Sequence, residues 1–133
     1  MIAVGWIFAL LAATIHIVVF VWEAFLIGRP SVHQGIFGVP ARDVPAVRLW
    51  AFGVGFYNLF LACGMIIGVV AWMSGNETVG RTLVIYISVF MVLGGVVLFV
   101  SDRLGLGRER GKGIGGALAE SLPPLVALTA ALL

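Results

Sequence analysis

The chain has 133 residues, of which 62% are hydrophobic and 11% are charged. Soluble domains carry about 25% charged residues, and a chain this short cannot hide so much apolar surface from water, so the composition excludes a soluble fold. The net charge of +2 does not suggest a nucleic-acid partner, and a lone cysteine, Cys63, permits neither an internal disulfide nor a cysteine metal motif.

Four apolar segments are each long enough to cross a bilayer, whose hydrocarbon core of roughly 30 Å takes about 20 helical residues. We expect helices over residues 2–27, 46–73, 82–100 and 114–133. Strands of a membrane barrel would be shorter and would alternate polar with apolar residues, which these segments do not. The sequence therefore predicts one transmembrane domain, 1–133, folded as an all-α integral membrane four-helix bundle.

The first segment carries two ionisable side chains, His16 and Glu23. It lacks a basic start and exceeds the apolar core of a signal peptide, so we expect it to remain as a membrane helix. An ionisable group in hydrocarbon costs roughly 2.5–3.5 kcal/mol on insertion scales, so each one needs a reason to be there. Because His16 and Glu23 are seven residues apart, they share a helix face and are predicted to line one cavity.

The second segment follows a loop, 29–45, whose prolines and glycines argue against a long regular helix. Within the segment, Trp50, Val54, Asn58 and Leu61 recur at helical spacing and form one stripe. This stripe predicts an indole at the mouth of the cavity and an amide at its floor.

The basic residues predict the orientation of the bundle. Seven of the eight lie in or beside the loops 29–45 and 101–113, and only Arg81 lies at the opposite end. By the positive-inside rule, both loops are cytoplasmic and both termini lie on the non-cytoplasmic side. We therefore expect a multi-pass protein of the plasma (inner) membrane.

The fourth segment places Glu120 just before Pro123 and Pro124. Two consecutive prolines remove two amide donors, so the carbonyls of Ala119 and Glu120 lose their usual helical partners. In a membrane such carbonyls must be satisfied by another helix, a hydroxyl, water or a ligand. The segment thus offers a carboxyl group beside free carbonyls.

A structural interpretation of these polar groups stays open. His16 and Asn58 could hydrogen-bond across two helices to hold the bundle together. Glu23 could serve only as an ion-pair partner for Arg29 or Arg48 near the membrane interface.

Several short motifs resemble a family of small four-helix bacterial membrane proteins catalogued as domain of unknown function thirteen-zero-four. The motifs are the stretch from His16 to Glu23, the Tyr57-Asn58 signature that runs to Gly64, and the segment from Gly113 to Pro123. The resemblance implies a four-helix fold and the grouping of His16, Glu23, Tyr57 and Asn58, but no activity. The family usually has glutamine in place of Glu120, and often Asn-Gln in place of Gly53-Val54, which suggests a different ligand or chemistry here.

The predicted ligand-binding residues are His16, Glu23, Trp50, Tyr57, Asn58 and Glu120. The first hypothesis is a polar intramembrane cavity for a small, largely apolar or lipid-like ligand. An enzyme would use Glu23 or Glu120 as acid or base with His16 as relay, by analogy with lipid-modifying bundles. Whether the protein is an enzyme, and with what cofactor, stays open.

Two other function classes remain. A proton-coupled carrier would suit a carboxyl group beside the two prolines, but four helices would require a homo-oligomer. A non-catalytic accessory protein would use its buried polar groups to specify helix packing or to hold a membrane lipid. A metal site built from His16, Glu23 and Glu120 lacks the usual ligand spacing, so none is predicted.

Overall fold

The computed structural model describes residues 2–106 and 109–133. In this part of the chain, the helices are α1 (Ile2–Ala24), α2 (Pro30–His33), α3 (Val44–Met73), α4 (Glu77–Leu104) and α5 (Ile114–Leu132), and a short 3-10 turn, η1 (Ala41–Asp43), precedes α3. Four of these helices, all but α2, are long and apolar enough to cross a membrane. The all-α class is confirmed, and so is the expectation of four helices long and apolar enough to cross a membrane.

The end of α1 and both ends of α4 differ from the expected positions by three residues or more, and the ends of α3 and α5 by two residues at most. α1 ends at Ala24 rather than residue 27, because the amides of Phe25 and Leu26 both bond to Val21 O and the chain then turns. α4 spans 77–104 rather than 82–100, since Asn76 caps its start through a bond from Val79 N. Gly105 ends it in the left-handed conformation, with φ +71°, which glycine adopts without strain. These capping residues extend α4 by about a turn at each end.

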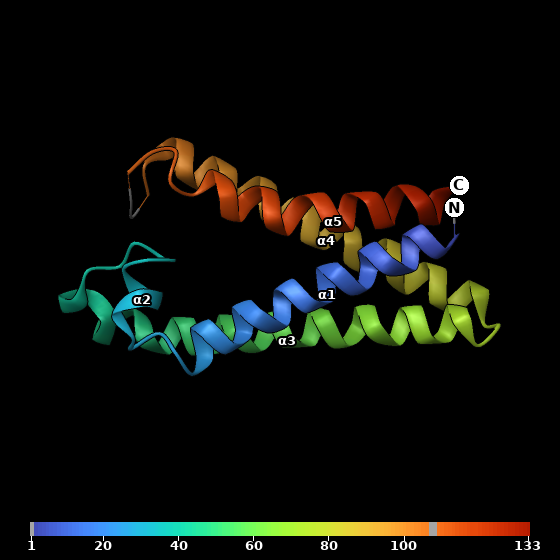
Figure 1. Ribbon diagram of the computed structural model, residues 1–133, viewed down its shortest axis with the longest axis horizontal. Coiled ribbons are helices and arrows are strands. Elements are labelled where there is room, and N and C mark those ends of the chain that lie inside the picture. Colours follow the sequence, from blue (N-terminus) through green and yellow to red (C-terminus); the bar gives the residue numbers. More distant parts are fainter. Residues whose placement is uncertain (1, 107–108) are drawn as a thin grey trace.

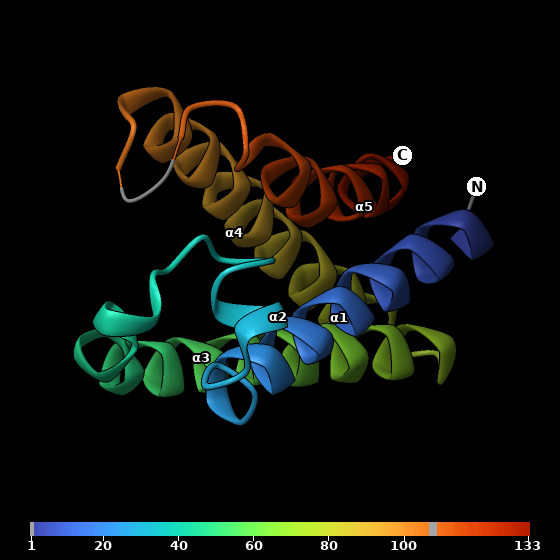
Figure 2. The same ribbon diagram turned by 60° about the vertical axis from the view of Figure 1, so that its left-hand side comes forward.

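The four long helices pack in a ring in the order α1, α3, α4, α5. Figures 1 and 2 show that α1 pairs with α3 and that α4 pairs with α5. The two pairs meet at the end where both termini lie. They spread apart at the other end, which carries the segment around α2 and the connection between α4 and α5.

One half of the bundle, towards the termini, holds the apolar core. Its α1 and α5 contributions are mostly alanines, so these two helices approach closely, and a Cβ on Gly5 would lie only 3.1 Å from that of Ala130. Larger side chains of α3 and α4 fill the rest. The buried cluster consists of Ala9, Ala12, Ala13, Ala62, Met65, Val69, Trp72, Val84, Ile87, Met91, Ala127 and Ala131.

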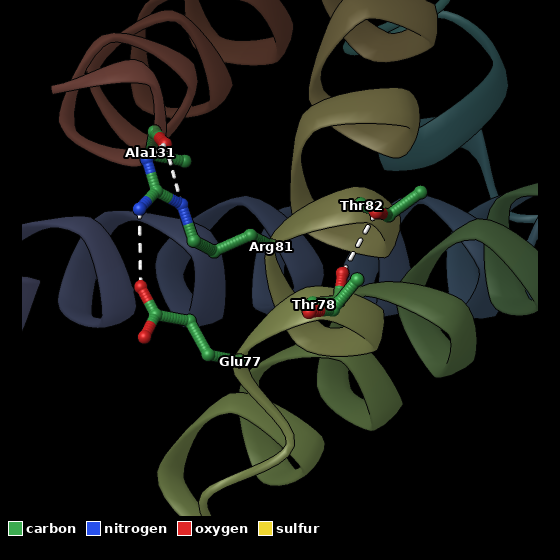
Figure 3. A network of polar contacts seen from close by, with 5 residues as sticks. All are labelled: Glu77, Thr78, Arg81, Thr82 and Ala131. Carbon is green, nitrogen blue, oxygen red and sulfur yellow. Dashed lines mark hydrogen bonds and ion pairs between the residues drawn. The ribbon is translucent and has the colours of Figure 1, made fainter.

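Arg81 ties the start of α4 to the end of α5 at this packed end (Figure 3). Its guanidinium donates to the carbonyl oxygen of Ala131 from Nε at 3.1 Å and from Nη2 at 2.6 Å. It also pairs with Glu77 at 3.0 Å and lies over the Trp72 ring. A cation at the last carbonyls of a helix satisfies an acceptor that the helix itself leaves free. Arg81 therefore closes the packed half.

Asp102 organises the opposite end. Its carboxylate is buried and accepts bonds from Gly111 N at 2.7 Å, Gly113 N at 2.6 Å and Arg103 Nη2 at 2.8 Å. Gly113 precedes the first residue of α5, so this side chain fixes where α5 begins. The chain after α1 folds back in a similar way, because the buried His33 donates from Nδ1 to Val39 O at 2.8 Å.

The outer surface of the bundle is apolar. In the most hydrophobic window of each long helix, no more than 33% of residues are buried inside the protein. Large apolar side chains therefore point outwards along every long helix, among them Ile7, Phe60, Ile67, Leu93 and Leu132. Such a surface is stable when lipid rather than water surrounds it.

Alanine substitutions at two adjacent glycines of α4 would test the packing of α4 on α5. A Cβ at Gly95 would collide with Ser121 Oγ and lie 2.9 Å from Ala117 O, whereas a Cβ at Gly94 meets nothing within 4 Å. We expect Gly95→Ala to cost about 1–3 kcal/mol through overpacking, which thermal unfolding in mild detergent would show as a lower Tm. Gly94→Ala is the matched control and should leave Tm unchanged or slightly raised. Equal melting of the two variants would contradict the observed α4–α5 contact.

Candidate functional site

The half of the bundle away from the termini contains a partly open cavity of about 640 Å³, which we call the main cavity. It lies where the two helix pairs spread apart, and the segment after α2 covers part of it. Most of its lining side chains are apolar. The lining residues are Thr14, Ile15, Val18, Val19, Trp22, Glu23, Ile36, Phe37, Val54, Asn58, Gly94, Val97, Leu98, Ser101, Gly116, Ala119 and Glu120.

Glu23 and Asn58 are joined across α1 and α3. Asn58 Nδ2 donates to Glu23 Oε2 at 2.9 Å. Gly55, one turn earlier in α3, makes this approach possible, since a Cβ there would already lie 3.2 Å from Glu23 Cβ and from Phe20 O. The bond uses one amide hydrogen and leaves Asn58 Oδ1 free to accept another.

Glu120 brings a second carboxyl group to the main cavity from α5. The helix continues through Pro123 and Pro124, both of which are buried. Because proline has no N–H, the carbonyls of Ala119 and Glu120 receive no helical bond from these positions. Both residues line the main cavity, so acceptor-rich backbone accompanies the carboxyl group there.

Ion pairing separates these two acids from the other four. Asp43, Glu77, Asp102 and Glu109 each pair with an arginine or lysine at 2.7–3.7 Å. Within residues 2–106 and 109–133, neither Glu23 nor Glu120 has such a partner. The alternative in which Glu23 pairs with Arg29 or Arg48 therefore finds no support, and its observed partner is the neutral Asn58.

His16 lies outside the lining of the main cavity. It is buried, with 4% of its surface exposed, and its Nδ1 lies 2.9 Å from Ala12 O. A carbonyl only accepts, so Nδ1 carries the proton of this bond. His16 is the last buried residue of α1, and Glu23 lies two turns further along the same face. It thus marks the level at which tight packing gives way to the main cavity.

Neither Trp50 nor Tyr57 lines the main cavity. Trp50 lines a smaller cavity of about 330 Å³, which shares Glu23, Phe37 and Val54 with the main cavity. Tyr57 lines neither cavity and is 68% exposed on the outer face of α3. The structure therefore brings together Glu23, Asn58 and Glu120, places Trp50 next to them, and keeps His16 and Tyr57 apart.

Some lining residues were absent from the sequence prediction. Ile36 and Phe37 reach the main cavity from the segment after α2, and Trp22 and Ser101 reach it from α1 and α4. Trp22 could have been included because it directly precedes Glu23, whereas nothing local distinguishes Ile36 from an ordinary loop residue. Among the residues that the structure describes, no three His, Cys, Asp or Glu side chains gather closely enough to hold a metal ion.

Comparison with known proteins gives a family without an assigned activity. The family model described as "Protein of unknown function (DUF1304)" matches residues 10–132. No curated protein and no solved structure matches the chain.

The Glu23–Asn58 bond can be tested with adjacent residues of α3. Asn58→Leu removes the donor to Glu23 and should lower the stability of the detergent-solubilised protein by about 1–3 kcal/mol. Tyr57→Phe, on the outer face, should change Tm little. In a Glu23→Leu background the cost of Asn58→Leu should largely vanish, because the two side chains act as a pair. An Asn58→Leu cost that persists in that background would rule out the pairing.

Proposed function

The chain belongs to the DUF1304 family of proteins of unknown function, and from the geometry of the main cavity we propose that it binds a small, largely apolar or lipid-like ligand there. The observation that supports this is one space that combines apolar walls with convergent polar groups. Ligand sites are typically concave spaces of about 300–1,000 Å³, mostly apolar, with a few placed polar groups that orient the ligand. The main cavity, at about 640 Å³, has this composition.

The placement of the polar groups also supports binding over a purely structural role. Polar groups that only hold helices together satisfy one another, as Asn58 and Glu23 do. Glu120, by contrast, has no hydrogen-bond or ion-pair partner among the side chains of the described residues. A ligand in the main cavity would supply that partner.

We also propose that loops 29–45 and 101–113 face the cytoplasm, with both termini on the other side of the plasma membrane. The two loops lie at one end of the bundle and the termini at the other (Figure 1). Seven of the eight basic residues belong to the loop end, and basic loops are retained in the cytoplasm. The main cavity would then lie in the cytoplasmic half of the membrane.

Native mass spectrometry after gentle extraction tests the ligand proposal. We expect a bound small molecule on the wild type that is lost in Gly94→Leu, because Gly94 lines the main cavity and has open space above it. Leu93→Phe, at an adjacent position that faces outwards, should retain the bound mass. A wild type that carries no bound molecule, or a Gly94→Leu variant that keeps it, would contradict the proposal.

Labelling of single cysteines tests the orientation. In a Cys63→Ala background, Lys112→Cys should react with a membrane-impermeant maleimide only from the cytoplasmic side. Ser74→Cys, in the turn between α3 and α4, should react only from the opposite side. The reverse pattern would invert the proposed topology.

A further inference from the structure

The charge of the main cavity is unbalanced. Two of the chain's six acidic residues, Glu23 and Glu120, line it, and within residues 2–106 and 109–133 no lysine, arginine or histidine does. An ionised carboxylate in a low-dielectric interior is costly unless a cation or a proton accompanies it. The other four acids all obtain a cation from the protein itself. For Glu23 and Glu120, the balancing positive charge must come from outside the described part of the chain.

The hydrogen-bonding groups of the main cavity are mostly acceptors. The acceptors are the two carboxyl groups, Asn58 Oδ1 and the backbone carbonyls that Pro123 and Pro124 leave without helical donors. The donors are fewer: the Ser101 hydroxyl, the Trp22 indole N–H and the second amide hydrogen of Asn58. The hydroxyl of Thr14, which also lines the space, already donates to Leu10 O. A ligand that matches this surface donates several hydrogen bonds and accepts few.

The walls of the main cavity indicate which chemical group accompanies the hydrogen-bond donor of the ligand. They are largely aliphatic, with the aromatic side chains of Trp22 and Phe37 near Glu23. Aromatic faces attract organic cations, and aliphatic walls favour a hydrocarbon body over a hydrated inorganic ion. Since no three metal-ligating side chains gather in the described residues, a bare metal ion fits the main cavity poorly.

We propose that the ligand of the main cavity is an amphipathic primary amine, whose ammonium group lies between Glu23 and Glu120 and whose hydrocarbon part fills the apolar space. The inference rests on the proposed function and adds the charge and donor character of the ligand. One ammonium and one proton balance the two carboxyl groups. The same chemistry occurs in a free alkylamine and in the head group of an amine-bearing phospholipid.

The test compares two probes with the same chain, dodecylammonium and dodecanol, by calorimetric titration into the full chain in non-ionic detergent at neutral pH. Wild type should bind the ammonium at least about tenfold more tightly, as expected for charge-assisted hydrogen bonds. Glu23→Gln and Glu120→Gln should each weaken ammonium binding by about tenfold and leave dodecanol binding within about twofold. Glu109→Gln, which removes an exposed acid paired with Lys112, should change neither.

Binding of dodecanol to the variants shows that the main cavity is still folded, so a loss confined to the ammonium cannot be ascribed to misfolding. Equal affinities of wild type for both probes would overturn the amine assignment while the proposed function stands. Failure of both probes to bind would overturn both proposals.

A second pair of probes distinguishes the two sources of the amine. Lysophosphatidylethanolamine and lysophosphatidylglycerol share a single chain and a phosphate but differ in the ammonium group. A preference for the first, lost in Glu120→Gln, supports the proposal with a lipid as the ligand. Equal binding of these two lipids together with tight dodecylammonium binding supports it with a free alkylamine.

Discussion

The close approach of α1 and α5 through alanines determines the shape of this protein. Ala9, Ala12 and Ala13 of α1 belong to one buried cluster with Ala127 and Ala131 of α5 in the half near the termini, where side chains too small to hold backbones apart give tight packing. In the other half α1 carries larger or polar residues, among them Val18, Val19, Trp22 and Glu23, and there the two pairs spread apart. A bundle packed at one end and open at the other accompanies this difference in side-chain volume along α1.

The low dielectric constant of the membrane makes unpaired acids in the open half energetically costly. In water, an unpaired glutamate costs nothing, but within apolar walls its charge must be neutralised or balanced. The protein balances its other acids with its own arginines and lysine, including Asp102, whose buried carboxylate also holds two backbone amides. Glu23 and Glu120 have no such cation among the described residues. This difference points to the main cavity, rather than the loops, as the functional site.

Part of the site could be predicted from sequence because helical periodicity and the position of a residue within an apolar segment are local properties. The sequence places Glu23 and Glu120 within apolar segments long enough to cross a membrane, and the structure brings both to one cavity with Asn58. The same reasoning grouped His16 with them, since it shares the face of Glu23. It lies two turns closer to the packed end, where that face meets other helices, so it is buried instead.

The sequence by itself determined the number of membrane helices, because a run of twenty apolar residues in a chain this short has few stable structures other than a helix in a membrane. It also determined the family and the intramembrane position of the polar residues. Only the tertiary structure decided that Asn58 bonds Glu23, that Tyr57 faces outwards, and that Ile36 and Phe37 reach the main cavity from a loop. These facts depend on how helices cross and how far apart they lie, which small residues such as Gly55 and Gly95 set through contacts remote in sequence.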